Sequence, residues 1–224
     1  NRLGSITNIA QDEDIFATRY MGNRLYMVTF EQIDPFFVID LSNPKTPEIL
    51  GELKLPGFSR YLHPYDENHI IGLGQETTLT GRTTGLKISI FDVSDVTKPI
   101  EKTNYVSLER YAQSTALYEH KAFLFSKDKN LLVIPAYNYA YDGGESYNGA
   151  FLFNISVDKI SLRGIIDHSY AQKDNYWGSL VERSLFIDDV LYTKSPTLLR
   201  SHNLTTTQAI KDVQLKQATT LLLL

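Results

Sequence analysis

The sequence predicts an all-β fold: a β-propeller of four-stranded antiparallel blades, with about four blades in this chain as part of a larger propeller. One phrase occurs twice, at 36–44 (FFVIDLSNP) and at 88–95 (ISIFDVSD), where Pro99 follows. Each copy is a short apolar run that ends in Asp, an aliphatic residue, Ser and Asx, which predicts a strand, a tight turn and a return strand. Repeats of roughly 40–50 residues built only from short strands are typical of propeller blades.

The rest of the chain follows the same pattern. Apolar and β-branched residues come in runs of about five to eight, broken by Gly, Asn, Asp and Pro, and no long window keeps a helical period. The repeated phrase is interpreted as the third strand of a blade. The expected strands are then 15–20, 24–30, 36–41 and 49–55 in the first blade; 58–64, 68–75, 86–93 and 100–106 in the second; 112–125, 131–136, 149–155 and 160–167 in the third; and 181–187, 190–195, 198–204 and 208–215 in the fourth.

Both ends of the chain differ from this pattern. Residues 3–9 (LGSITNI) resemble the outer strand at 49–55 (ILGELKL), so we expect residues 1–10 to be the outer strand of a preceding blade. The blades then span 1–215, and 216–224 form a C-terminal tail. Four blades plus a leftover strand fit either a small closed propeller with an interlocked edge or the second half of a larger ring, whose open edges would need a partner segment.

Composition excludes several classes of protein. The 224 residues are 42% hydrophobic and 21% charged, with a formal net charge of -4, so no basic surface for nucleic acid is expected. Cysteine is absent, which removes disulfides, thiolate metal sites and cysteine nucleophiles. No apolar stretch is long enough to span a bilayer. The chain starts without methionine or a signal-peptide pattern, so we expect a fragment or a processed product.

Several longer phrases carry a family resemblance: 21–30 (MGNRLYMVTF), 34–42 (DPFFVIDLS), 56–59 (PGFS), 61–69 (YLHPYDENH) and 118–125 (YEHKAFLF). Together they resemble a family of secreted archaeal and bacterial proteins with a C-terminal β-propeller domain distantly related to WD-type repeats. The resemblance runs from about Gly4 to Leu215 and implies further blades upstream and an extracellular or cell-surface location. It implies no activity and transfers no catalytic residue.

Propeller topology divides the connections between two edges of the blades. The turns at 21–23, 65–68 and 188–189 are short and share one edge, whereas the long connections at 76–85, 137–149 and 168–178 share the other. Loops on a rigid scaffold often bind, and Tyr and Trp offer large contact area. We therefore expect this loop edge to bind a protein or a glycan, although the same aromatics would also serve to pack the loops onto the blades. The candidate binding residues are Tyr137, Tyr139, Tyr141, Tyr147, Tyr170, Tyr176 and Trp177.

Few residues suggest chemistry. Asp142, Glu145 and Asn148 are spaced so that a turn could gather three oxygen ligands around Ca²⁺, but the same residues also build ordinary turns. The five histidines lack metalloprotease spacing, and no P-loop, dinucleotide fingerprint or nucleophile elbow is present. Because Asp40 and Asp92 recur at equal places before a Ser-Asx turn, we interpret both as structural carboxylates.

Three functions remain open at this point. The first is a non-enzymatic extracellular propeller that binds through its loop edge, with no catalytic residues and no cofactor beyond the Ca²⁺ option. The second is a propeller enzyme, a metal-assisted hydrolase or lyase with a site at the central channel. The third is a structural module of a surface layer or filament. Asn154 and Asn203 fit the N-glycosylation pattern, which would suit a secreted chain.

Overall fold

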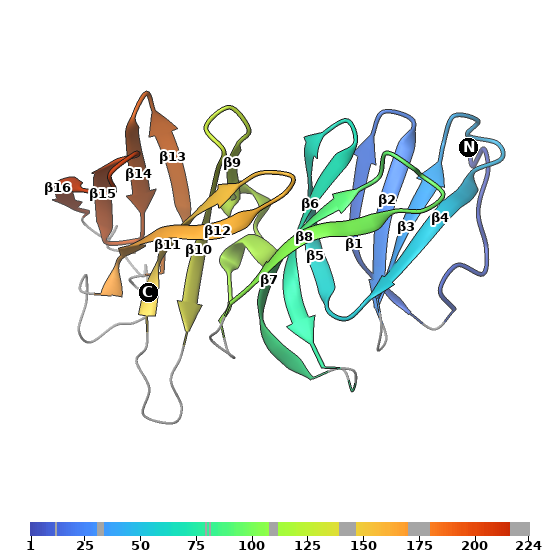
Figure 1. Cartoon of the computed structure of the whole chain (residues 1–224), viewed down its shortest axis with the longest axis horizontal. Coiled ribbons are helices and arrows are strands. Elements are labelled where there is room, and N and C mark those ends of the chain that lie inside the picture. The colour runs from blue at the N-terminus through green and yellow to red at the C-terminus, as the bar shows by residue number, and fades with distance from the viewer. Residues whose placement is uncertain are drawn as a thin grey trace, which may run out of the picture. The chain divides into compact units, whose positions relative to one another are not determined.

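The computed structural model describes residues 1–11, 13–30, 34–78, 80, 82–107, 112–138, 147–169 and 180–215. In these residues the chain forms four antiparallel four-stranded sheets and two single turns of 3₁₀ helix (Figure 1). The predicted all-β fold with four blades is therefore confirmed. The helices of the described residues are too short to cross a bilayer.

Each sheet is a meander of strands consecutive in the sequence, and the bounds are as follows. The first sheet has β1 (Asp14–Met21), β2 (Arg24–Phe30), β3 (Asp34–Asp40) and β4 (Glu48–Leu55), and the second has β5 (Phe58–Asp66), β6 (His69–Thr77), β7 (Thr83–Asp92) and β8 (Ile100–Val106). The third has β9 (Leu124–Ser126), β10 (Leu131–Asn138), β11 (Tyr147–Ile155) and β12 (Ile160–Asp167), and the fourth has β13 (Arg183–Ile187), β14 (Val190–Lys194), β15 (Leu198–Asn203) and β16 (Ala209–Gln214).

One predicted strand is wrong. A long inner strand was expected over 112–125, but the structure has η1 (Thr115–Leu117) and η2 (His120–Ala122) there. The segment pairs with β10 only through an isolated bridge from Gln113 to Tyr137 and through the short β9. Side chains explain the difference: the Ser114 hydroxyl accepts from the Ala116 N–H at 3.1 Å, and the Glu119 carboxylate accepts from the Lys121 N–H at 3.1 Å. Such local bonds offer the backbone an alternative to a sheet ladder.

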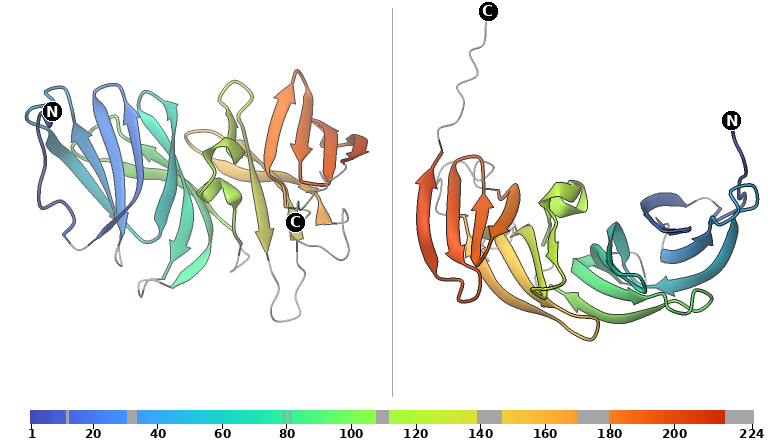
Figure 2. Two further views of the ribbon diagram at one scale, coloured as in Figure 1. Left: turned by 180° about the vertical axis from the view of Figure 1, so that it is seen from behind. Right: turned by 90° about the horizontal axis from the view of Figure 1, so that it is seen from above.

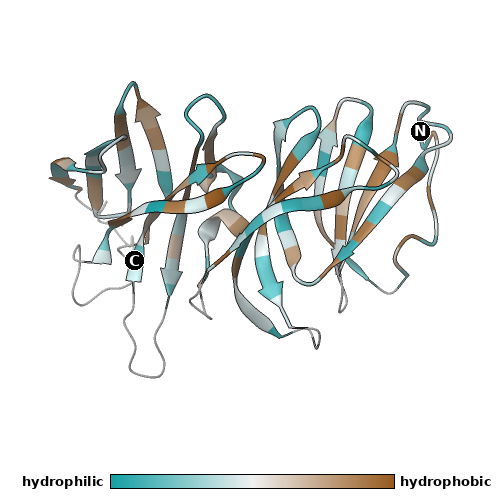
Figure 3. Cartoon of the chain, in the orientation of Figure 1, coloured by the Kyte–Doolittle hydropathy of each residue, from teal (hydrophilic) through white to brown (hydrophobic). Residues whose placement is uncertain are grey.

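The described chain forms two compact units. Unit 1 contains the described residues within 1–112 and 155–161, and unit 2 contains those within 113–154 and 162–215. Unit 1 thus holds the first two blades, and the tip of the β11–β12 hairpin belongs to it. Toward the end of the outer strand β4 hydrophobic residues alternate with polar ones (Figure 3), and along the outer strand β8 exposed residues alternate with partly buried ones. The middle strands β6 and β10 are buried along most of their length, as expected where both faces of a strand are covered.

In unit 1 the core lies between the first and second blades. The Phe36 ring from β3 stacks on the Phe91 ring from β7 with 4.6 Å between centroids, and Tyr26, Val38, Leu62 and Ile70 join the same cluster. The inner strands β1 and β5 lie side by side (Figure 2). Unit 2 has its own core, made by Leu131, Val133 and Leu152 together with Leu191 and Leu204 of the last blade.

Glycine allows a strand to lie very close to the backbone of a neighbouring turn. A Cβ on Gly51 of β4 would lie 2.4 Å from the carbonyl oxygen of Val96, in the β7–β8 turn of the next blade. A Cβ on Gly4 would likewise lie 2.5 Å from the carbonyl oxygen of Pro44, in the β3–β4 turn. Gly4 and Pro44 thus repeat the relation of Gly51 and Val96.

The N-terminal segment occupies the place of an outer strand but does not form one. Residues 1–7 have no regular secondary structure here, and their role as the outer strand of a preceding blade stays a prediction. Ile6 and Ile9 instead pack on Met27, Phe37 and Ile39, on the face of the first blade that points away from the second.

Candidate functional site

The predicted loop-edge residues fall partly within the described structure. Tyr137 lies near the C-terminal end of β10, and Tyr147 is the first residue of β11. Both side chains are half-buried. The Tyr147 ring lies 5.2 Å from that of Phe151, and burial raises the pKa of Tyr137. These two tyrosines form the base of the β10–β11 connection. The other candidates, Tyr139, Tyr141, Tyr170, Tyr176 and Trp177, lie outside the described residues.

Of the three residues predicted to bind Ca²⁺, only Asn148 lies within the described structure. Asn148 is buried in β11, where its N–H donates to the Ser169 hydroxyl at 3.2 Å and its carbonyl accepts from the His168 N–H at 2.8 Å. Its main chain therefore ties β11 to the segment that follows β12. Asp142 and Glu145 lie outside the described residues. Within the described residues no group of three His, Cys, Asp or Glu side chains could hold a metal ion.

The repeated carboxylates have the structural role that the sequence predicted. Asp40 accepts from the N–H and the hydroxyl of Ser42 at 2.9 and 2.6 Å, and Asp92 accepts from the same two groups of Ser94 at 2.9 and 2.6 Å. The hydroxyl bond, followed by the N–H bond, lowers the pKa of each carboxyl. Both carboxylates hold the turn after the third strand.

These short turns also line a pocket that the sequence did not predict. In unit 1 the β1–β2 turn, the end of β3, the start of β4 and the β5–β6 turn enclose a volume of about 480 Å³. We call it the turn-edge pocket. Small-molecule sites typically measure about 300–1,000 Å³, so its size suits a compact ligand. Its wall includes Arg24, Tyr26, Asp40, Ser42, Leu50 and Glu67.

The wall of the turn-edge pocket carries both signs of charge. Arg24 and Asp40 are directly opposite each other in the β2–β3 ladder, and the Arg24 side chain makes no hydrogen bond or short ion pair with another described residue. Glu67 is exposed on the β5–β6 turn. The Tyr26 side chain is 0% exposed, and its hydroxyl has no hydrogen-bond partner among the described residues. Buried hydroxyls are usually hydrogen-bonded; among the described residues those of Thr115 and Ser184 also lack a partner, but only Tyr26 lines this pocket.

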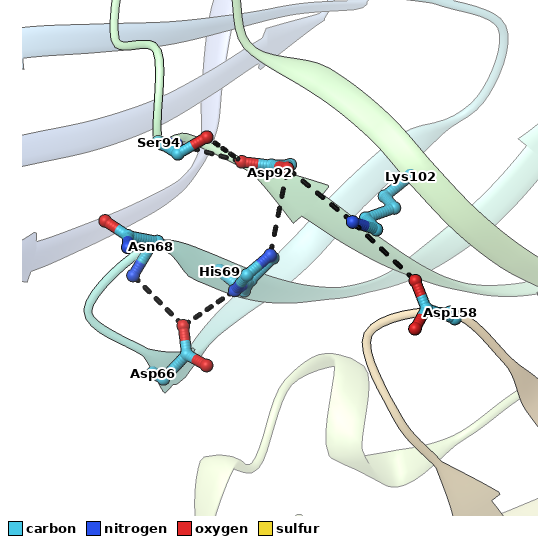
Figure 4. Close-up of polar contacts among 7 residues, drawn as sticks. All are labelled: Asp66, Asn68, His69, Asp92, Ser94, Lys102 and Asp158. Atoms are coloured by element: carbon cyan, nitrogen blue, oxygen red, sulfur yellow. Dashed lines mark hydrogen bonds and ion pairs between the residues drawn. The ribbon is translucent and has the colours of Figure 1, made fainter.

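The second blade fills the equivalent position with its own side chains. His69 is opposite Asp92 in the β6–β7 ladder, as Arg24 is opposite Asp40. Its Nδ1 lies 2.7 Å from Asp66 Oδ1, and its Nε2 lies 3.8 Å from Asp92 Oδ2 (Figure 4). Because both ring nitrogens face carboxylates, His69 links the β5–β6 turn to the end of β7.

Figure 4 also shows the polar contacts that continue from Asp92. Lys102 Nζ lies 3.9 Å from Asp92 Oδ2 and 3.6 Å from Oδ1 of Asp158, on the tip of the β11–β12 hairpin. The Lys102 side chain is about one-third exposed and Asp158 is largely exposed. Such exposed, loosely spaced ion pairs contribute about 0–1 kcal/mol. The hydrogen-bonded turn carboxylates, rather than these pairs, hold the edge of the blade.

The inner strands of unit 1 bring together a second set of polar side chains. On β5 the hydroxyl of Tyr61 lies 3.0 Å from Nδ1 of His63. Burial, together with the nearby Arg19 of β1, lowers the pKa of His63 to about 4, so this imidazole is neutral near pH 7. Burial raises the pKa of Tyr61. A metal-assisted site at the inner strands would need several converging ligands, and among the described residues no group of three His, Cys, Asp or Glu side chains could hold a metal ion.

Unit 2 contains a buried polar cluster between its two blades. His168 follows β12 and is 0% exposed, with its Nε2 2.8 Å from the hydroxyl of Thr193 on β14. Burial, and to a lesser degree Arg200, lowers its pKa to about 4. Arg200 forms two hydrogen bonds to Asp212 at 3.0 Å each. This cluster joins the third and fourth blades of the unit.

A four-stranded meander repeated with a recurring turn after the third strand defines a propeller domain. A model of the beta propeller domain family matches residues 1–207, and the chain belongs to this family. An uncharacterised protein of Methanocaldococcus jannaschii is 36% identical over 214 residues, and one of Archaeoglobus fulgidus is 35% identical over 214 residues. Each match covers 96% of this chain and 30% of the relative, so the chain spans less than a third of these curated relatives.

Solved structures agree on the fold. A candidate dipeptidyl aminopeptidase IV from Bacteroides ovatus superposes with a TM-score of 0.52 at 11% identity, over 92% of this chain and 30% of that one. At this identity the likeness concerns the fold alone. The family expectation is thus confirmed for the propeller domain and for archaeal relatives. Secretion and a C-terminal position within a longer protein stay predictions.

Proposed function

We propose that this chain is part of an extracellular or cell-surface β-propeller that binds a protein or glycan through its loop edge and has no enzymatic activity of its own. The observation that carries the proposal is the long connection of the third blade, where β10 ends at Asn138 and β11 begins at Tyr147. It joins a second strand to a third strand, so it leaves its sheet at the loop edge. The β6–β7 connection leaves the second sheet at the same edge but spans only residues 78–82, because β6 and β7 extend further than the sequence predicted.

The chemistry of the described residues supports binding more than catalysis. The repeated carboxylates accept hydrogen bonds from their own turns, and His69 lies between two carboxylates. A general base needs a free nitrogen close to a reacting proton, and neither ring nitrogen of His69 is placed for that. Tyr137 and Tyr147 form an aromatic base for the β10–β11 connection, which suits a contact surface.

We also propose that further propeller segments cover the outer faces of the end blades. On the last blade Leu185 is 50% exposed and Ile187 is 59% exposed, and Val213 is exposed too. Apolar sheet faces of this kind normally pack on another layer, as the first blade packs on the second. In each relative the part outside the match is more than twice as long as the matched part. That length is enough for additional blades.

Binding at the loop edge is tested with the double variant Trp177→Ala and Tyr141→Ala on a glycan array and against cell-surface proteins of an archaeal host. We expect the variant to lose at least tenfold in affinity for every partner of the wild-type chain, since aromatic anchors often dominate binding energy. Tyr20→Ala is the matched control, because Tyr20 is exposed on β1 beside the short β1–β2 turn. Unchanged binding by the double variant would reject the loop edge as the binding surface.

A further inference from the structure

The turn-edge pocket of unit 1 has the composition of a ligand site. We propose that it binds a small zwitterion, a free amino acid or short peptide, whose carboxylate meets Arg24 and whose ammonium group meets Asp40 and Glu67. The site lies at the short-turn edge, opposite the loop edge. It is therefore independent of the binding function proposed above.

A comparison of the two blades in unit 1 carries the argument. The turn residues Met21, Gly22 and Asn23 correspond to Asp66, Glu67 and Asn68, because Arg24 and His69 hold equal places opposite Asp40 and Asp92. In the second blade Asp66 reaches back to His69 at 2.7 Å. In the first blade Met21 replaces that carboxylate.

Arg24 therefore keeps its charge without a hydrogen-bonded partner among the described residues, whereas His69 has one. A ligand carboxylate would take the place that Asp66 occupies in the second blade. Arginine is well suited to this role because its planar guanidinium pairs with carboxylates through two parallel hydrogen bonds.

Tyr26 gives the second, independent indication of a ligand. Its side chain is fully buried in the wall of the pocket, and its hydroxyl has no hydrogen-bond partner among the described residues. A phenylalanine would fill the same space against the stacked ring of Phe36, 5.9 Å away, without leaving a polar group unsatisfied. A hydroxyl kept there at a cost to stability suits a role in contacting a ligand.

The charges of the wall select among small ligands. Arg24 supplies a cation, and Asp40 and Glu67 supply two carboxylates, from three different turns or strand ends. Asp40 uses one oxygen, Oδ1, for both bonds to Ser42, so its Oδ2 stays open to an ammonium group. Leu50 adds an apolar surface for a side chain. A purely anionic ligand would be repelled by the two carboxylates, and an uncharged sugar would leave all three charges unpaired.

The test is isothermal titration calorimetry of the full 224-residue chain with the twenty free amino acids and the dipeptide Ala-Ala. N-acetyl-Ala-Ala lacks the ammonium group, Ala-Ala amide lacks the carboxylate, and glucose lacks both. We expect binding of at least one free zwitterion and at least a tenfold loss on capping either end, since each cap removes a charge-assisted hydrogen bond. Absence of binding by all zwitterions up to millimolar concentration, or equal binding of capped and free dipeptide, would overturn the proposal.

Two variants separate the site from the fold. Tyr26→Phe should bind the zwitterion about tenfold more weakly, yet raise the urea midpoint of the free protein, because it removes an unsatisfied buried hydroxyl. Arg24→Gln should also weaken binding by about tenfold or more, with far-UV circular dichroism unchanged. Tyr20→Phe, on an exposed side chain of the same hairpin, should alter neither quantity. Wild-type affinity in Tyr26→Phe and in Arg24→Gln would place the bound zwitterion elsewhere and refute the assignment.

Discussion

The buried imidazole of His168 should make unit 2 sensitive to mild acid. The ring is 0% exposed, and its pKa in the folded chain is lowered to about 4, from the ordinary 6.5. Burial is the main cause, and Arg200 and His202 act in the same direction, whereas Asp167 and Asp212 oppose them. Between pH 6.5 and pH 4 the unfolded chain therefore binds a proton that the folded chain does not.

The sign follows from this difference in bound protons. Stability rises with pH wherever the unfolded state holds more protons, so the contribution of His168 is complete above pH 6.5 and is lost as the pH falls toward 4. One pKa unit corresponds to about 1.4 kcal/mol. The gap between 6.5 and about 4 gives about 3 kcal/mol in full, of which about 2.5 kcal/mol is lost by pH 4.5.

The variant His168→Gln isolates this contribution. Glutamine does not titrate, and its amide can still reach the Thr193 hydroxyl that the imidazole contacts at 2.8 Å. Urea unfolding followed by far-UV circular dichroism at pH 7.5, 6.0 and 4.5 should show a wild-type loss of stability that exceeds the loss in the variant by about 2.5 kcal/mol at the lowest pH. The control His120→Gln changes an exposed imidazole on η2.

NMR titration of the histidine side chains provides the second measurement. The His168 resonance should stay neutral at pH 5.5 and titrate near 4. His63 of unit 1, whose pKa is also about 4, adds the same kind of loss to both proteins and cancels in the comparison. Parallel pH profiles of wild type and His168→Gln, or a His168 titration near 6.5, would refute the reasoning.

Two further changes test the packing of the second blade. Gly74→Ala should destabilise unit 1 by about 3 kcal/mol or more, measured by urea unfolding, because the new Cβ would lie 1.6 Å from the carbonyl oxygen of Phe58. Gly164→Ala, where the nearest atom to a new Cβ is the Thr207 methyl at 3.5 Å, should cost far less, and equal losses would contradict the argument. Lys87→Met should cost about 3–5 kcal/mol, because Lys87 is only 7% exposed and its ammonium group lies 3.0 Å from Glu76 and 3.1 Å from Glu101. Lys102→Met should change the free energy of unfolding by at most about 1 kcal/mol, and a loss as large as that of Lys87→Met would show that burial does not decide the cost.

The features that the sequence predicted correctly are local. The turn after the third strand depends on a carboxylate and a hydroxyl two residues apart, Asp40 with Ser42 and Asp92 with Ser94, and the strands follow from alternation within a few residues. The prediction of an inner strand over 112–125 was wrong for a local reason that the hydrophobic pattern does not show. Ser114 and Glu119 satisfy backbone N–H groups of the two 3₁₀ turns, and apolar content alone does not distinguish these turns from a strand.

The candidate site, by contrast, depends on contacts between blades. Nothing near Tyr26 in the sequence indicates that its hydroxyl is unsatisfied, because the surrounding cluster includes residues from the second blade, such as Leu62 and Phe91. The pocket likewise needs Glu67 brought to the edge of the first blade. One signal was available: alignment of the two turns places Met21 where the second blade has Asp66. That substitution is visible in the sequence, but its meaning requires the ladders that pair Arg24 with Asp40.

Repetition therefore has different consequences at the two equivalent positions of unit 1. Asp40 and Asp92 use one oxygen for the same turn. In the second blade the other oxygen of Asp92 faces His69 and Lys102 at 3.8 and 3.9 Å, so the edge is closed by the protein's own side chains. In the first blade the corresponding position forms a pocket of about 480 Å³ beside Arg24. A turn whose carboxylate is needed for the fold can thus also present charge to a ligand, and the residue that decides between the two outcomes is the one at the start of the preceding turn, Met21 or Asp66.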